Sequence, residues 1–409
     1  MNTVTLMRID EPPPPRAPAG GPDRSFALWR LGFRPFYLLA SGFAALSIGA
    51  WGLQYAGLLP GAYLQGPLWH AHEMLFGFVL AVVVGFLFTA GRNWTNRPTP
   101  TGAPLAALAA LWLAGRVLVL SSFPLAAAVA SAAFPLAAAV ALAIPFVAAR
   151  NRRNYFFIGL LALMAVADAL FHLALAGLVP LPGGLGIQLG LDVILFIMAV
   201  MGGRVIPMFT NNAIPGAAAS RHPRLEKAAL GTTLALLPLD LLQGSSLALP
   251  AGVAALVAAA GAALHAARWW RWQPWTTRRT PIVWVLHLGY LWIVVHLALR
   301  AAAGLGWATG SAATHALTAG AIGGLVIGMI TRTALGHTGR PLRAGPVEVA
   351  SYVLVALAAA VRTFVPLAVP SLTVAAVGLS AALWSAAFAI YVAGYWPVLT
   401  RPRLDGRPG

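Results

Sequence analysis

Charge is scarce in this chain: charged residues make up 9% of the 409 positions, whereas hydrophobic residues make up 59%. Water-soluble domains carry about a quarter charged residues, because a folded surface has to be solvated. A chain with so few charges cannot cover the surface of a globular protein of its size, so most of its exterior must face lipid. The composition therefore excludes a soluble domain and predicts an integral membrane protein.

Cysteine is absent, which excludes disulfides, iron–sulfur clusters, thiolate metal sites and the Cys-x-x-Cys-His attachment of haem. Any metal in this protein must use histidine, methionine, carboxylate or backbone ligands, and any haem must be bound non-covalently. The sequence also lacks a Gly-rich phosphate loop with its lysine and a Gly-x-Ser-x-Gly elbow. The sequence therefore gives no support to nucleotide binding or to hydrolysis by a serine nucleophile.

Acidic residues are few as well: 10 stand against 27 basic residues, which gives a formal net charge of +17 at pH 7. Residues that bind a phosphate backbone gather on one face or in one run. Here the basic residues form short groups separated by two apolar segments, which is how a polytopic membrane protein is oriented. We therefore expect membrane lipid as the surrounding partner and no nucleic-acid partner.

Long apolar runs are what the chain has in abundance, and a transmembrane helix needs about 20 such residues. Counting these runs predicts an all-α fold, a polytopic membrane helix bundle with about twelve transmembrane helices. The predicted spans are residues 36–59, 70–91, 103–121, 124–148, 155–178, 186–208, 227–243, 248–270, 281–302, 311–333, 347–366 and 371–397.

The loops between these spans predict the orientation. With the N-terminus inside, only Arg116, Arg300 and Arg362 of the 27 basic residues lie in or near the outer halves of the spans. Positively charged loops stay in the cytoplasm, so both termini are expected to be cytoplasmic. The predicted domains are a disordered, Pro-rich cytoplasmic tail (1–29), a single transmembrane domain (30–398) and a short basic cytoplasmic tail (399–409).

Three predicted spans end in similar segments. Residues 202–210 and 323–331 both begin with Gly-Gly and end in threonine, and residues 84–89 resemble them more loosely. Because the second, sixth and tenth spans run in the same direction, a threefold repeat of four helices is one interpretation. Coincidence among segments rich in glycine, valine and isoleucine is the other.

Ionisable side chains inside spans are candidates for function, since each costs about 2.5–3.5 kcal/mol at the bilayer centre. Four acids and seven of the nine histidines qualify. One group of histidines lies at the outer level of the predicted topology, namely His70, His72, His172, His315 and His296. The inner level holds His265, His287 and the loop residue His337, whereas His222 lies among arginines in a solvated loop.

The densest group is Trp69-His70-Ala71-His72-Glu73-Met74. Residues two apart on a helix point about 200° apart, so His70 and His72 cannot both face one ligand if both are helical. His70 and Glu73 could share a face, or His70 could lie in a turn before the helix. The segment indicates a metal site, and helix capping with interfacial anchoring is the alternative.

Two further spans carry a histidine that is a candidate metal or porphyrin ligand. Asp168 and His172 are four residues apart on one helix face, where the carboxylate could orient a metal-bound imidazole or simply form a buried hydrogen bond. The tenth span combines His315 with a smooth glycine face, which allows close helix packing or admits a flat porphyrin between facing helices. Helix packing alone explains the glycines but not His315. His287 and His296 are nine residues apart and cannot serve the same metal.

Several motifs together resemble the NnrS family over residues 30–397. They are Phe33-Arg34-Pro35-Phe36, the His70–Met74 segment, Asn93-Trp94-Thr95, Gly202-Gly203-Arg204-Val205-Ile206-Pro207, Leu286-His287-Leu288-Gly289-Tyr290, and Arg332 with Gly336-His337-Thr338-Gly339-Arg340. The resemblance implies a bacterial inner-membrane protein that carries haem and copper and acts in the response to nitric oxide, often alongside denitrification.

Carried over to this chain, the resemblance points to a set of metal-centre and cofactor contacts. They are His70, His72, His172, His287, His315 and His337, with Arg204 and Arg332 from the same motifs. The outer histidines His70, His72, His172 and His315 are expected to bind metal, and Glu73 or Asp168 to relay protons. The expected cofactors are non-covalent haem b and copper.

Two functions remain open at this stage. The first is a haem and copper protein that scavenges nitric oxide or reduces it as a reductase-like oxidoreductase, with an electron donor that the sequence does not identify. The second is a secondary transporter of copper, haem or a small substrate, which twelve helices and an internal repeat would also suit. A haem–copper oxidase subunit ranks lower, because the chain has neither a His-Pro-Glu-Val segment nor adjacent histidines.

Overall fold

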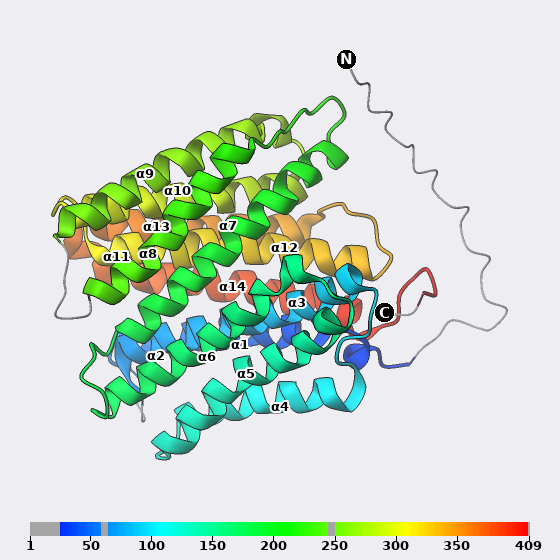
Figure 1. Ribbon diagram of the computed structural model, residues 1–409, viewed down its shortest axis with the longest axis horizontal. Helices are drawn as coiled ribbons and strands as arrows, with labels where there is room; N and C mark the ends of the chain where they lie inside the picture. The colour runs from blue at the N-terminus through cyan, green and yellow to red at the C-terminus, as the bar shows by residue number, and fades with distance from the viewer. Residues whose placement is uncertain (1–24, 59–63, 244–249, 408–409) are drawn as a thin grey trace.

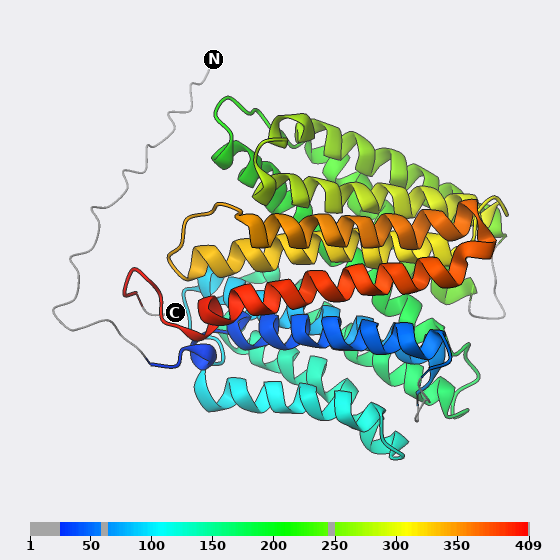
Figure 2. The same cartoon turned by 180° about the vertical axis from the view of Figure 1, so that it is seen from behind.

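A computed structural model describes residues 25–58, 64–243 and 250–407. Within these ranges the chain forms twelve helical rods side by side and no strand, so the predicted all-α bundle is confirmed (Figures 1 and 2). The rods are α1 (Phe33–Tyr55), α2–η2–α3 (Gly66–His72, Glu73–Val79, Leu80–Thr95), α4 (Gly102–Val119), α5 (Pro124–Ala148), α6 (Phe156–Leu175), α7 (Leu185–Ala213), α8 (Pro223–Gln243), α9 (Ala251–Arg271), α10 (Pro281–Gly304), α11–η5–α12 (Gly310–His315, Ala316–Ile322, Gly323–His337), α13 (Pro346–Ala368) and α14 (Thr373–Thr400).

Eleven of the rods in the described ranges are long and apolar enough to cross a membrane, which supports a multi-pass membrane protein. The remaining rod, α8, is 21 residues long and carries Arg224, Glu226, Lys227 and Asp240. Its charges make it too polar for a helix surrounded by lipid, and it lies between α7 and α9. The predicted count of about twelve helices thus agrees with the structure, and α8 is the one whose composition departs from a membrane span.

The N-terminal end of α1 and the C-terminal end of α14 lie at one end of the bundle, as an even number of rods requires (Figure 1). We call this the terminal end and the other the opposite end. The predicted tail of residues 1–29 lies mostly outside the described residues, but its last part is ordered. Leu28–Arg30 forms a short 3-10 turn, and the backbone amide of the buried Ala27 donates to the Thr400 carbonyl at 2.7 Å. The predicted domain boundaries stay a prediction.

The centre of the bundle is formed by α2–η2–α3, α7 and α11–η5–α12, the three most deeply buried spans. These rods contain the similar segments found in the sequence. In each of them the threonine that ends the segment donates its hydroxyl to the carbonyl four residues earlier, at 2.8–2.9 Å: Thr89, Thr210 and Thr331. This bond satisfies a hydroxyl inside an apolar core. The threefold repeat itself stays a prediction.

Two of the central rods contain a π-helical segment directly after a histidine. Glu73–Val79 follows His72, and Ala316–Ile322 follows His315. A π-helix shifts the hydrogen bonds by one residue and turns the side chains that follow, and such segments are rare and concentrated at functional sites. Both lie near the opposite end of the bundle, so this end holds the histidine-rich part of the protein.

Helices α10 and α12 approach so closely at Gly289 and Gly324 that neither position has room for a side chain. A Cβ atom added to Gly289 would lie 2.7 Å from the backbone nitrogen of Leu325, and one added to Gly324 would lie 2.9 Å from the Cα of Gly289. Because the obstacle is backbone rather than a flexible side chain, the two helices would have to move apart.

We therefore expect Gly289→Val to destabilise the protein by about 1–3 kcal/mol, the usual cost of overpacking a core. Gly378→Ala in α14 is the matched control, because nothing lies within 4 Å of its added Cβ. The control should keep or slightly raise stability, since alanine favours helix over glycine by up to about 1 kcal/mol. Thermal unfolding in detergent measures both variants, and equal midpoints for Gly289→Val and wild type would contradict the packing.

Candidate functional site

The two histidines of the densest sequence motif face different parts of the bundle. The imidazole of His72 points toward α6, where its Nε2 lies 2.8 Å from Oδ1 of Asp168. The ring of His70 instead stacks on Trp51 of α1 and faces His315. This is the outcome that a two-residue spacing on a helix requires. The outer histidines therefore form two separate sites rather than one.

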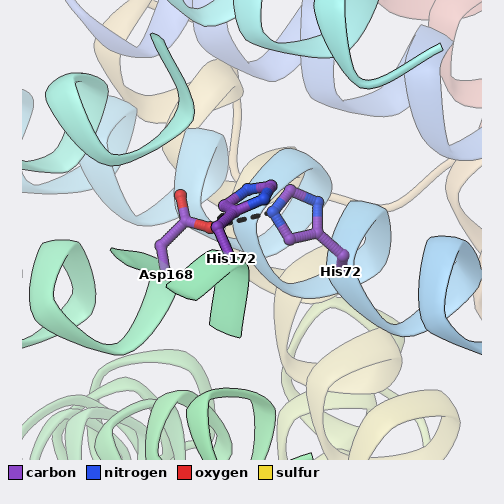
Figure 3. Close-up of side chains that lie close together, drawn as sticks. All are labelled: His72, Asp168 and His172. Atoms are coloured by element: carbon purple, nitrogen blue, oxygen red, sulfur yellow. Dashed lines mark hydrogen bonds and ion pairs between the residues drawn. The ribbon is translucent and has the colours of Figure 1, made fainter. Parts of the chain in front are cut away.

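The first site is the His72–Asp168–His172 cluster (Figure 3). Asp168 Oδ1 lies 2.8 Å from His72 Nε2 and 3.5 Å from His172 Nε2. One donor atom from each of the three residues lies within 4.8 Å of the other two, and all three side chains are buried. Two imidazole nitrogens and one carboxylate oxygen can thus converge on a metal ion, a donor set that suits copper or zinc.

Glu73 and Arg116 extend this cluster toward α4 and α5. The second nitrogen of His72, Nδ1, lies 2.8 Å from Oε1 of Glu73. The same oxygen accepts from Nη1 of Arg116 at 2.6 Å, and Nη2 of Arg116 donates to the hydroxyl of Ser131 at 2.9 Å. Glu73 therefore fixes the orientation of the His72 ring, as a second carboxylate commonly does for a metal-bound imidazole.

The charges of the cluster balance when His72 carries a proton. Glu73 and Asp168 supply two negative charges, and Arg116 and protonated His72 supply two positive ones. All four side chains are at most 5% exposed. A buried network of this kind is costly to break, because removing one partner leaves an uncompensated charge in a low-dielectric interior.

We expect Arg116→Met to destabilise the protein by about 3–5 kcal/mol, because Glu73 would keep a buried negative charge without its cation. The double variant Arg116→Met with Glu73→Gln should recover most of this loss, since it removes both charges. Thermal unfolding in detergent measures both proteins. A double variant no more stable than Arg116→Met alone would show that the loss comes from packing rather than from charge.

The second site is an apolar cavity of about 370 Å³ at the opposite end, which we call the His70–His315 cavity. Its walls come from α1, α2, η2, α7, α11, η5, α13 and α14. The rings of Trp51 and His70 are 4.9 Å apart at 12°, and those of His70 and His315 are 6.2 Å apart at 5°. Two nearly parallel imidazoles from different central rods thus face one cavity.

Hydrogen bonding determines which nitrogen of His315 is available. Its Nδ1 lies 2.7 Å from the backbone carbonyl of Ser311, which can only accept, so Nδ1 carries the hydrogen. The lone pair of neutral His315 is therefore on Nε2, the form in which an imidazole binds a metal. His70 has a buried Nδ1 without a hydrogen-bond partner, which is unusual for a buried polar atom.

Arg362 of α13 supplies the cavity with a cation. Within the part of the chain that the structure describes, Arg362 makes no ion pair with an acid. The predicted topology placed both Arg362 and Arg116 in or near the outer half of a span, but the sequence analysis assigned neither residue a role. Trp51 was also missed, because neither its position nor its spacing distinguishes it from an interfacial tryptophan.

The chain matches the family described as NnrS protein over residues 27–403. This protein belongs to the NnrS family. A search of curated proteins finds no match. Membership of the NnrS family supports a role in the nitric oxide response.

Other candidates from the NnrS motifs lie apart from these two sites. Nε2 of His287 lies 2.8 Å from the hydroxyl oxygen of Thr210. Because that hydroxyl donates its hydrogen to the carbonyl of Ile206, Nε2 of His287 must be the donor in this contact. The buried Nδ1 of His287 has no hydrogen-bond partner. His337 ends α12 at the terminal end of the bundle and packs on Phe33 at 5.7 Å. The structure therefore does not bring His287 or His337 to the outer histidines.

The two arginines from the NnrS motifs pack on aromatic rings. Arg204 donates to Asn154 at 2.9 Å and lies over Phe156. Arg332 is buried with its guanidinium 3.7 Å from the ring centroid of Phe209, and its Nη1 has no hydrogen-bond partner. Neither arginine lines the His70–His315 cavity. Their role as cofactor contacts stays a prediction.

His265, an inner histidine outside the NnrS motifs, has both ring nitrogens hydrogen-bonded within the protein. Its Nδ1 lies 2.6 Å from the hydroxyl of Tyr290, and its Nε2 lies 2.9 Å from that of Thr233. With both nitrogens bonded, the ring holds α8, α9 and α10 together and has no nitrogen left for a ligand.

Proposed function

We propose that this protein binds haem and copper inside the membrane and uses them to take up nitric oxide. The observation that carries the proposal is the pair of nearly parallel imidazoles, His70 and His315, in one apolar cavity. Membership of the NnrS family supports it independently.

The His70–His315 cavity fits haem in three respects. Its volume of about 370 Å³ lies within the range of about 300–1,000 Å³ found for small-molecule sites. Two imidazoles, those of His70 and His315, line it with their ring centroids 6.2 Å apart, and imidazole is a common ligand of haem iron. Arg362 offers a cation for a carboxylate group. His70 and His315 are the residues that would offer the iron an imidazole ligand.

The His72–Asp168–His172 cluster fits copper. Its nitrogen and oxygen donors match the preference of Cu(II), and the chain has no thiolate that would compete. Glu73 would then accept from Nδ1–H of His72 and keep its Nε2 directed at the metal. The cluster balances its own charge when no metal is present, so it could also serve as an ion network alone. A measurement of copper binding distinguishes a metal site from a purely structural ion network.

Each part of the chain has a defined task in this proposal. When bound, haem supplies an iron that coordinates a diatomic gas. The apolar lining of the cavity admits an uncharged gas that partitions into the bilayer, and it excludes water and ions. His70 and His315 orient the cofactor, Arg362 anchors it, and the cluster beside His72 holds the second metal nearby on the same rod.

Metal analysis and gas uptake of the purified protein test this function. We expect a b-type haem spectrum in stoichiometric amount, copper detected by mass spectrometry, and anaerobic consumption of nitric oxide by the reduced protein above that of free haem. A protein that is folded but contains no haem would contradict the proposal and favour the transporter. Haem without uptake of nitric oxide would contradict the gas-binding role.

A further inference from the structure

A second cavity of about 400 Å³ lies beside the first, bounded by α7, α8, α10 and α11. Its rim includes the exposed residues Pro182, Gly184, Gln243 and Gly310 at the opposite end of the bundle. Unlike the His70–His315 cavity, whose one charged lining residue is Arg362, this one is lined by an acid, Asp240, together with Arg300. We call it the vestibule, because its rim is open to water at that end.

Two carboxylates share one arginine at the vestibule. Asp192 of α7 and Asp240 of α8 both pair with Arg300 of α10, and Nη1 of Arg300 lies 3.3 Å from Oδ1 of Asp192. The side-chain amide of Gln188 also donates to both acids, at 3.2 Å to Asp192 and 2.9 Å to Asp240. One guanidinium and one amide thus hold the two carboxylates close together.

The charges at the vestibule do not balance. Asp192 and Asp240 are only 2% and 7% exposed, and Arg300 cancels one of their two negative charges. The fourth titratable group at the vestibule is His296, which lies near Asp240 and Arg300. An uncompensated charge in a low-dielectric interior is costly, and binding one proton removes it.

His296 provides a second observation at the same place. Its Nδ1 donates to the backbone carbonyl of Ala313 at 2.8 Å, so the lone pair is on Nε2. This Nε2 has no hydrogen-bond partner, although His296 is only 4% exposed and lines the vestibule. Oδ2 of Asp192 is likewise buried without a hydrogen-bond donor. Both atoms are acceptors, and an acceptor without a donor is a place for a proton.

The vestibule and the His70–His315 cavity share part of their walls. Leu191 of α7 and Thr314 of α11 line both. Thr314 immediately precedes His315 and carries the one polar side chain in this shared wall. The acid pair therefore lies between water at the opposite end and the cavity that we propose for haem.

We propose that Asp192 and Asp240 together hold one exchangeable proton, taken up from water through the vestibule when the His70–His315 cavity gains an electron. The proposal rests on the proposed function for its electron acceptor. With haem bound, a one-electron reductant such as dithionite would supply the electron, and one proton would move from water to a carboxylate oxygen of the pair. The added positive charge offsets the added negative charge, whose cost is large in a medium of low dielectric constant.

The haem midpoint potential measured against pH tests the coupling. One proton taken up per electron lowers the potential by about 59 mV per pH unit, and we expect a slope approaching this value in wild type. Asp192→Asn should flatten the slope, because it removes the excess charge and leaves the Arg300–Asp240 pair intact. Asp240→Asn should flatten the slope as well, because it also removes the excess charge and leaves the Arg300–Asp192 pair intact. A flat wild-type slope, or variants with the wild-type slope, would overturn the proposal.

Asp405→Asn is the matched control at the terminal end of the bundle. Hydrogen bonds from Arg403 hold the pKa of Asp405 at about 2, so this carboxyl stays ionised over the pH range of the titration. The control should keep the wild-type slope. Loss of the slope in Asp405→Asn would overturn the assignment to the vestibule.

Infrared difference spectroscopy on pH change tests the proton site without using haem. We expect a protonated-carboxyl band in wild type and in Asp405→Asn that is missing from both Asp192→Asn and Asp240→Asn. A protein without haem that shows this band would retain the proton site and contradict only the proposed function. A protein with haem but without the band would contradict only the proton site.

Discussion

Replacing His315 with alanine is expected to leave the purified protein with about ten-fold less haem or lower. His315 is the residue whose Nε2 lone pair is set free by a bond from Nδ1 to the Ser311 carbonyl, so its removal deletes a prepared ligand. His70→Ala should have a similar effect, because the two rings line the same cavity. Haem is measured by pyridine haemochrome relative to protein.

The control for these variants is His222→Ala, since His222 is exposed in the segment between α7 and α8. It should keep the haem content of wild type. His172→Ala should also keep it, because His172 belongs to the other site. Full haem content in both His70→Ala and His315→Ala would show that the cavity does not hold the cofactor.

Replacing His172 with alanine is expected to remove copper while leaving haem in place. Among the three residues of the cluster, His172 is the best one to change, because it makes the longest contact, 3.5 Å to Asp168. The shorter bonds that join His72 to Glu73 and Asp168 would remain, so the buried charges stay balanced and the fold is expected to persist. His72→Ala, by contrast, would break the ion network as well.

Copper per chain, measured by mass spectrometry after exhaustive dialysis, decides this second prediction. His222→Ala is the matched control, because it removes an exposed imidazole that lies outside the cluster. The control should keep copper, and His172→Ala should lose nearly all of it. Equal copper in the two variants would reduce the His72–Asp168–His172 cluster to a structural ion network.

Much of the fold could be predicted, because the bilayer sets the length of every span and the loops carry the positive charge. The same simple geometry predicted that His70 and His72 point apart and that Asp168 and His172 share a face. These are properties of a single helix. They follow from the rotation per residue and need no knowledge of neighbouring helices.

The contacts between helices could not be predicted in this way. His72 and Asp168 are 96 residues apart, and their 2.8 Å contact depends on how α2 packs against α6. The partner of Arg116 and the cavity around Arg362 depend on packing for the same reason. The π-helical turns after His72 and His315 left no sequence signature, since a shift of one hydrogen bond per turn is decided by the neighbours of the helix.

Anomalous X-ray scattering at the iron and copper edges of crystals of the metal-loaded protein tests the central claim most directly. The account predicts an iron peak between His70 and His315 and a copper peak among His72, Asp168 and His172. An iron peak elsewhere in the bundle, for example beside His287 or His337, would contradict it.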